Sequence, residues 1–253
     1  MTSSLRRVRS AACIVVLLLG LTATASAAPG SKIKAVAFDA FPVFDPRPVF
    51  DLAEKLFPGK GAALCDDWRA RQFEYTWLRS MSGTYADFWQ VTEDALVFAA
   101  KKQKLQLSAD ERKQLMDAYL DLKPWPDAPA ILRSLKGAGI RLVFLSNFTS
   151  KMLEADIKSS GLEGIFEQAI STDRLKTYKP DPRAYQMAVD ALGLKRDEIV
   201  FVAFAGWDAA GAKAFGYKTF WVNRLNLPLE ELGVAPDAAS PNLSGLEKLV
   251  NQP

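Results

Sequence analysis

The stretch Ile33-Lys34-Ala35-Val36-Ala37-Phe38-Asp39 decides the fold, because a short apolar run ends there in a single carboxylate. An apolar run of this length is typical of a strand that is buried on both faces of a sheet. Three similar runs follow at 141–145, 199–204 and 219–222, and 166–172 is a candidate for a further strand. These runs predict a sheet whose strands come from distant parts of the chain.

Helical patterns separate the predicted strands. Asp127, Asp181 and Asp208 each begin one helix, and the last of these helices stops at Gly216. Strands that alternate with short helices indicate a parallel sheet with right-handed crossovers, so the predicted fold class is an α/β, Rossmann-like core. The stretch after Leu225 is rich in proline and asparagine and is expected to wrap the surface.

Residues 46–125 interrupt this alternation, because they hold long helical patterns and no convincing strand. Within them, Ser108-Ala109-Asp110-Glu111 is a capping box that begins a helix. A helical insert after the first strand of an α/β core is a candidate cap domain over the active site. We therefore expect a core domain of residues 28–45 and 126–253, with residues 46–125 as the helical cap domain.

The first 27 residues have the pattern of an export signal. Three arginines precede an apolar run at 11–21, and Ala25-Ser26-Ala27 supplies a cleavage motif of small residues. The apolar run is too short to span a bilayer, so we expect a signal peptide at 1–27 and no stable membrane anchor. The mature protein is then periplasmic or secreted. An uncleaved anchor is the alternative, and the general secretory and twin-arginine routes both stay open.

Charge gives no sign of a polyanionic partner. The chain has 32 Lys and Arg against 29 Asp and Glu, and three of the arginines lie in the predicted signal, which holds no acid. The mature chain would therefore carry 29 of each and a net charge of 0. A neutral chain gives no reason to expect nucleic acid or an acidic membrane as a partner.

Histidine is absent from the sequence, and its absence restricts the chemistry. Catalysis by Ser-His-Asp or Cys-His groups is excluded, and so are histidine-based metal sites. Any general base must then be a carboxylate or a less usual group. Because Cys13 lies in the predicted signal, Cys65 has no partner for an internal disulfide.

Polar side chains follow the predicted strands, and ligands of parallel sheets gather at the carboxyl ends of the strands. Asp39 ends the first strand, Ser146-Asn147 ends the next, and Asp208 lies in the loop after the third. Lys179 lies just before a helix. In such a set Asp39 can attack an electrophilic carbon while Lys179 holds it ionised. Ser146 can hydrogen-bond beside Asp39, and Asp208 can deprotonate the water that releases the product.

Each of these residues also has a purely structural interpretation. A strand-ending aspartate such as Asp39 is often a turn or helix cap, and Ser146-Asn147 is ordinary turn chemistry. Lys179 has the features of a solvated loop lysine, and Asp208 those of a helix N-cap. Their joint occurrence at successive strand ends favours a catalytic site.

The order of these motifs resembles the haloacid dehalogenase superfamily, and the cap segment resembles its type II (S)-2-haloacid dehalogenases in particular. The likeness extends from about Lys32 to Arg224. The residues that carry it are 38–45, 145–147, 178–181 and 206–208 for the superfamily, and 68–80, 215–217 and 221–224 for the type II enzymes.

Two aromatic residues separate the chain from the phosphatases of that superfamily. Phe41 stands where those enzymes carry the second Asp of Asp-x-Asp, and Phe204 matches the position of their acidic Mg²⁺ ligand. A phenyl ring offers no oxygen to a hard cation. The resemblance therefore implies a reaction at carbon that uses neither a metal nor an organic cofactor.

The resemblance also assigns roles to residues. Asp39 would displace halide from C2 of a short (S)-2-haloacid with inversion, and water would release the 2-hydroxy acid from the ester. Arg69 on the cap matches the residue that receives the halide, and Asn147 would assist. The guanidinium of Arg69 stays charged at working pH. Tyr185 matches a tyrosine near the nucleophile–lysine network. Four aromatic residues would wall a pocket that excludes water, with core packing as the alternative for the middle two: Phe41, Phe73, Phe88 and Trp207.

The likeness fails at three positions that have lost polar groups. Val43 replaces a threonine, and Ala203 and Ala205 replace a serine and a water-positioning asparagine. Because these losses fall on the hydrolytic half of the mechanism, our hypothesis is that Asp39 is alkylated but releases the ester slowly. The alternatives are a catalytically impaired relative that binds a small carboxylate, and a hydrolase of another small acid or ester. Enzymes of this type are often dimeric, so a homodimer is compatible with the resemblance.

Overall fold

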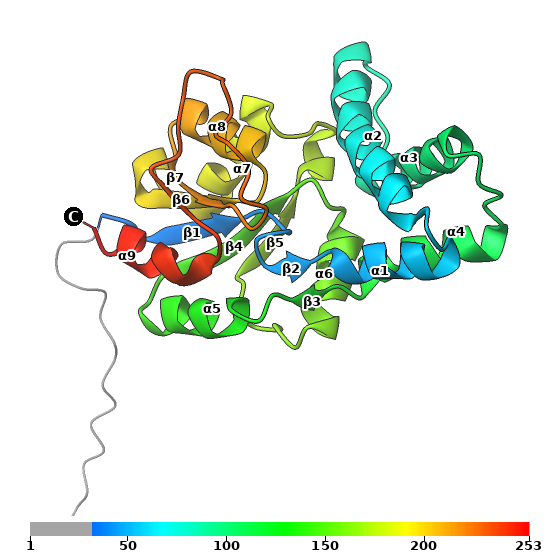
Figure 1. Cartoon of the computed structure of the whole chain (residues 1–253). Coiled ribbons are helices and arrows are strands. Elements are labelled where there is room, and N and C mark those ends of the chain that lie inside the picture. Colours follow the sequence, from blue (N-terminus) through cyan, green and yellow to red (C-terminus); the bar gives the residue numbers. More distant parts are fainter. Residues whose placement is uncertain (1–31, 253) are drawn as a thin grey trace, which may run out of the picture.

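The computed structural model describes residues 32–252, so the predicted signal at 1–27 lies outside the described residues. A single sheet of parallel strands forms the centre of the molecule (Figure 1), which confirms the predicted α/β core. Across the sheet, the strands follow the order β5 (Gln168–Ser171), β4 (Arg141–Ser146), β1 (Ala35–Phe38), β6 (Ile199–Ala203), β7 (Lys218–Val222) and β8 (Ala238–Ser240).

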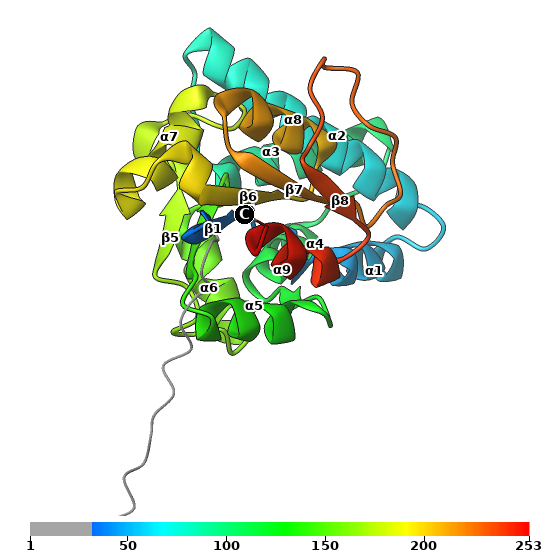
Figure 2. The ribbon, with the colours of Figure 1, turned by 90° about the vertical axis from the view of Figure 1, so that its left-hand side faces the viewer.

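Helices cover both faces of the sheet, as Figure 2 shows. One layer holds α5 (Ala128–Gly137), α6 (Ser150–Ser159) and α9 (Leu246–Val250), and the other holds α7 (Pro182–Leu192) and α8 (Gly206–Phe215). Short 3₁₀ helices connect these elements: η2 (Thr172–Leu175), η3 (Arg196–Glu198) and η4 (Leu243–Gly245).

The side chains of β1 alternate between two cores. Val36 and Phe38 pack with the helices of the first layer, whereas Ala35 and Ala37 pack with those of the second. Since both faces of β1 are buried, all four of its residues are apolar. The strand therefore ends in the middle of the sheet and delivers Asp39 to its carboxyl edge.

The segment predicted as a cap holds helices that lie together on one side of the sheet (Figure 1). They are α1 (Arg47–Leu56), α2 (Gly61–Ser82), α3 (Phe88–Lys102), α4 (Ala109–Asp117) and the 3₁₀ helix η1 (Ala118–Leu120). The predicted capping box forms, with reciprocal bonds between Ser108 and Glu111. Within residues 32–252, no helix is both long and apolar enough to cross a membrane.

A short antiparallel pair of strands closes the base of this insert, where the sequence pattern predicts no strand. Strand β2 (Phe44–Asp45) pairs with β3 (Lys123–Pro124). That expectation is wrong because two residues are too few to produce a recognisable alternation. The pair brings the two connections between core and cap side by side.

The stretch after Leu225 wraps the surface only in part. Its residues Ala238–Ser240 form β8 and pair with β7 as the edge of the sheet. Leu243, Leu246 and Val250 are then fully buried. The prediction of a surface wrap is therefore wrong for this last segment, where scattered leucines in a polar context do not show a helical period.

Asp127 occupies the N-cap position of α5, but its carboxylate does not cap the helix. It accepts hydrogen bonds from the Arg224 guanidinium at 3.0 and 3.1 Å and from the Leu243 amide at 2.9 Å. The predicted cap is wrong because these tertiary donors take the place of the helix amides. Asp181 does cap α7, accepting a bond from the Arg183 amide.

Candidate active site

Asp39 follows β1 directly and presents its two carboxylate oxygens differently. Oδ1 accepts hydrogen bonds from Lys179 Nζ at 2.8 Å and from Ser146 Oγ at 3.0 Å. Among the described residues, Oδ2 accepts only the Phe41 amide, at a long 3.4 Å. Oδ1 is therefore held in place, and Oδ2 is the oxygen with capacity to form a new bond.

Lys179 is buried between two carboxylates. Its Nζ atom lies 2.8 Å from Asp39 Oδ1 and 2.5 Å from Asp208 Oδ2, and the residue is only 1% exposed. Burial lowers the pKa of Lys179, but the charges of Asp208 and Asp39 raise it by a larger amount. The net shift is therefore upward, and the ammonium stays charged. The alternative of a solvated loop lysine is wrong.

Asp208 lies in the first turn of α8, whose N-cap is Ala205, so the N-cap alternative for Asp208 is wrong. Its Oδ1 accepts a hydrogen bond from the Tyr185 hydroxyl at 2.7 Å, and its Oδ2 accepts from Lys179. Burial raises the pKa of Asp208 to about 6, although the charge of Lys179 acts in the opposite direction. A carboxyl group that titrates near neutral pH is suited to accept a proton from water.

Asn147 supports the segment that carries Lys179. Its Oδ1 accepts hydrogen bonds from the Lys179 backbone amide at 3.0 Å and from Thr172 Oγ1 at 3.2 Å. Thr172 follows β5 and was not identified from the sequence, although it too comes directly after a strand. Asn147 therefore uses its carbonyl oxygen for structure, and its side chain also lines the cavity in front of Asp39.

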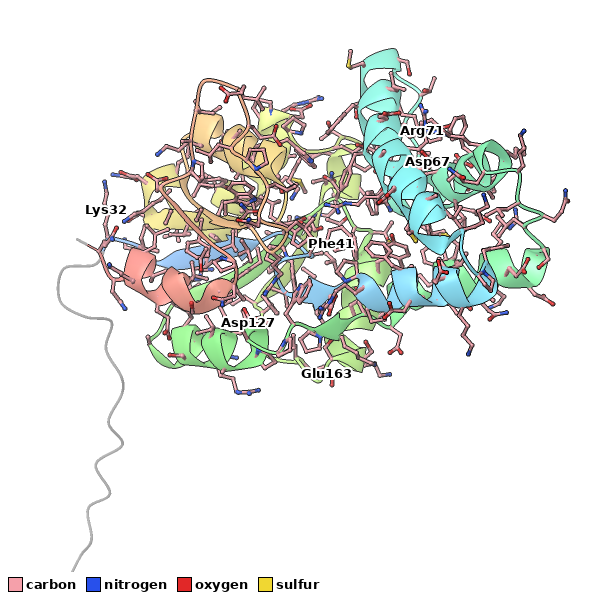
Figure 3. The ribbon with its side chains drawn as sticks, viewed as in Figure 1. Lys32, Phe41, Asp67, Arg71, Asp127 and Glu163 are labelled. Atoms are coloured by element: carbon pink, nitrogen blue, oxygen red, sulfur yellow. The ribbon has the colours of Figure 1, made fainter. Side chains whose placement is uncertain are left out.

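A small cavity of about 20 Å³ lies in front of Asp39. Phe41, which lies between the sheet and α2 in Figure 3, forms part of its wall. Of the other aromatic residues predicted for the pocket, all line this cavity: Phe73, Phe88 and Trp207. Three further lining residues were not predicted as pocket walls: Phe148, Phe204 and Ala205. Phe148 could have been found, because it directly follows Ser146-Asn147 at a strand end.

Two of the predicted site residues lie outside this cavity. Arg69, on α2, lines adjoining pockets, and its guanidinium carbon lies 5.7 Å from the centre of the Phe204 ring. Tyr185 lies behind Asp208, to which it donates its hydrogen bond. The structure thus brings Tyr185 to the nucleophile–lysine network, and it places Arg69 next to the reaction cavity rather than in it.

The three positions that lost polar groups differ in their relation to Asp39. Val43 and Ala203 are fully buried, whereas Ala205 lines the cavity. Within residues 32–252, no group of three Cys, Asp or Glu side chains is arranged to hold a metal ion. The Lys179 ammonium lies between the carboxylates of Asp39 and Asp208.

Comparison with known proteins identifies relatives across most of the chain. A protein-family model described as haloacid dehalogenase-like hydrolase matches residues 32–216. Haloacetate dehalogenase H-2 of Moraxella sp. (strain B) is 40% identical over 220 residues, which is 87% of this chain and 98% of that protein. The (S)-2-haloacid dehalogenase of Pseudomonas sp. (strain YL) is 43% identical over 206 residues, covering 81% of this chain and 89% of the relative.

Solved structures of similar fold are also found. The L-2-haloacid dehalogenase RSc1362 aligns with a TM-score of 0.85 and 43% identity, covering 87% of this chain and 99% of that one. The L-2-haloacid dehalogenase from Xanthobacter autotrophicus with chloropropionic acid covalently bound aligns with a TM-score of 0.80 and 34% identity. That alignment covers 86% of this chain and 98% of the solved one.

Proposed function

The chain belongs to the haloacid dehalogenase-like hydrolase family, and we infer from this membership that it hydrolyses the carbon–halogen bond of a short (S)-2-haloacid. The product is the corresponding 2-hydroxy acid. One observation carries the assignment at the level of the site. Asp39 has one oxygen fixed by Lys179 and Ser146 and the other oriented for reaction, at the edge of a small aromatic cavity.

In the first step, Asp39 Oδ2 attacks C2 of the haloacid. The new oxygen–carbon bond forms as the carbon–halogen bond breaks, and the halide leaves with the bonding electron pair, so C2 is inverted and Asp39 becomes an ester. Lys179 and Ser146 fix Oδ1 and thereby orient the attacking oxygen. The aromatic walls keep bulk water away from the carboxylate. Covalently bound chloropropionic acid in the Xanthobacter autotrophicus relative supports an ester route.

In the second step, water attacks the carbonyl carbon of the Asp39 ester. Asp208 takes one proton of the water as its oxygen bonds to the carbonyl carbon. The bond from this carbon to the substrate oxygen then breaks, this oxygen takes the second proton of the water, and the 2-hydroxy acid leaves as the Asp39 carboxylate is restored; Asp208 releases its proton to solvent. Negative charge that develops on Oδ1 is stabilised by the ammonium of Lys179 and the hydroxyl of Ser146, which already contact this oxygen. Both steps therefore use the same two donors.

We propose that the reaction needs neither a metal ion nor an organic cofactor, because side chains of the protein can accept each proton and stabilise each developing charge. Lys179 supplies the positive charge at Asp39, and Asp208 supplies the base. By resemblance, Arg69 receives the departing halide with help from Asn147. Arg69 lies next to the ring of Phe204, which also lines the reaction cavity, so we expect this role to depend on the position of that ring.

The test is halide release from (S)-2-chloropropionate by the mature protein, with intact mass measured in parallel and the D39N variant as control. Steady chloride release that the control lacks supports the assignment. One equivalent of chloride with a lasting gain in mass would mean that the ester forms but is hydrolysed slowly. If neither halide nor added mass is seen, the protein is better explained as a binder of small carboxylates or as a hydrolase of another acid or ester.

We also propose that the protein is exported, on the basis of the sequence pattern of residues 1–27. Cleavage near Ala27 would place the enzyme in the periplasm or the medium. The mass of the protein recovered from the periplasmic fraction tests this, and a full-length mass in the cytoplasm contradicts it. A homodimer is a further prediction from the resemblance, which light scattering on the purified protein decides.

A further inference from the structure

Phe204 stands at the junction of three cavities. It comes directly after β6 and lines the reaction cavity, a small pocket beside Arg69, and a larger outer pocket between α2 and residues 223–230. Its carbonyl oxygen accepts a hydrogen bond from Trp221 Nε1 at 3.1 Å, which fixes the backbone. The side chain of Phe204 is therefore the part that can change position.

The reaction cavity is smaller than the substrate that the proposed function requires. At about 20 Å³, it has room for about one water molecule. A 2-haloacid has a carboxylate, a halogen and a C2 substituent, so at least one wall must move before it binds.

Most aromatic walls of the cavity are held in place by neighbouring rings. Phe148 packs against Phe41 and Phe88, with ring centres 5.1 and 5.4 Å apart, and Phe88 and Phe148 are each only 1% exposed. Phe73 and Trp207 border the outer pocket, but both are held in a cluster of rings with Trp77.

Phe204 also borders the outer pocket, which has a volume of about 480 Å³, but unlike Phe73 and Trp207 it is not part of the ring cluster around Trp77. The centre of its ring lies 5.8 Å from that of Phe41, tilted rather than stacked, and 5.7 Å from the guanidinium carbon of Arg69. Movement of the ring toward the outer pocket would enlarge the reaction cavity. It would also open the reaction cavity toward the pockets that Arg69 lines.

We propose that Phe204 is a specificity-determining residue, whose ring moves to admit the haloacid and thereby limits the size of the C2 substituent. The inference rests on the proposed function and names its substrate range. A hydrogen atom or a methyl group at C2 needs a small displacement of the ring, whereas a longer alkyl chain needs the space that Phe204 fills. The native protein should therefore favour haloacetates and 2-halopropionates over longer 2-haloacids.

The experiment compares kcat/KM for (S)-2-bromohexanoate and (S)-2-bromopropionate in the native protein and in variants at position 204. In F204A the ratio of the two values should rise about tenfold or more, and in F204W it should fall, since each methylene in such a pocket changes discrimination by about that much. A loss of structure alone would not move the ratio in opposite directions. F98A truncates a half-buried phenylalanine of α3 that lines none of the three cavities, so it should leave the ratio unchanged.

The outcomes separate this inference from the proposed function. An unchanged ratio in both F204A and F204W, with 2-bromopropionate still hydrolysed, overturns the role of Phe204. Failure of the native protein to act on 2-bromopropionate contradicts the proposed function instead. If F204A does not fold, as judged by its melting transition, F204L is used in its place and the same rise in the ratio is required.

Discussion

The ammonium of Lys179 lies 2.8 Å from Oδ1 of Asp39, and this ion pair is almost fully removed from water. The second carboxylate on the same ammonium, that of Asp208, is also buried. Three charges at these distances stabilise one another only as a set, because each is desolvated and depends on the others. Both the catalytic chemistry and the stability of the core therefore depend on Lys179.

The K179M variant should lose both activity and stability. Without the ammonium, Asp39 and Asp208 would face each other as buried, unpaired carboxylates, which lowers the free energy of unfolding by about 3–5 kcal/mol. Halide release should fall by about 10²-fold or more, since the donor to Oδ1 is lost. Urea unfolding and initial rates measure the two effects. K176M, three residues away with a 64% exposed side chain, is the control and should behave as the native protein.

The rate of dehalogenation should rise with pH as Asp208 loses its proton. Because burial raises the pKa of Asp208 to about 6, the base is largely protonated below that pH and the ester is then hydrolysed slowly. The Tyr185 hydroxyl lowers the pKa of Asp208 by donating to its carboxylate, so Y185F should shift the acid limb of the profile to higher pH. A pH–rate profile of kcat for both proteins measures the shift. Identical acid limbs would argue against Asp208 as the base.

Asp156 should make the protein less stable as pH rises. It is fully buried on α6, its Oδ1 accepts the Leu122 amide at 3.0 Å, and its Oδ2 has no hydrogen-bond partner among the described residues. Burial raises the pKa of Asp156 to about 8, so the folded protein binds a proton that the unfolded chain releases above pH 4. The free energy of unfolding therefore falls between about pH 4 and 8.

The variant that tests this is D156N, which keeps the acceptor for Leu122 and removes the titration. Relative to the native protein, D156N should gain stability from pH 5 to about pH 8, by a few kcal/mol, and the difference should then level off. Urea midpoints at several pH values give the comparison. A difference between the two proteins that does not change with pH would show that Asp156 is already ionised in the fold.

The sequence indicates the core and its catalytic groups, because both are local patterns. Each strand of the inner sheet is a short apolar run, and Asp39 and Ser146 can be placed because they end such runs. The position of Arg69 could not be predicted in the same way. It depends on how α2 packs over Phe204, which is a contact between residues far apart in the chain. The final strand β8 escaped for a related reason, since its three residues are defined by pairing with β7 and not by their own composition.

Hydrolysis of the Asp39 ester should be the slower of the two steps. Ala205 lines the reaction cavity where the resemblance predicts a water-positioning asparagine, so the attacking water has lost one partner. Mixing the protein with (S)-2-bromopropionate should then release about one equivalent of bromide in a burst, before a slower steady phase. Bromide release that is linear from the first turnover would contradict this.

The A205N variant should raise the rate of the slow phase by about tenfold or more, because a side-chain amide can again hold the water. The matched control is A205L, which adds a similar volume without a polar group and should leave the burst or make it more pronounced. Ala205 is also the N-cap of α8 and makes no side-chain bond there, so an asparagine would stabilise the helix by about 1 kcal/mol. Melting curves separate that gain from the kinetic effect. A faster slow phase in A205N but not in A205L assigns the delay to the missing amide, whereas equal acceleration in both variants would assign it to the shape of the cavity.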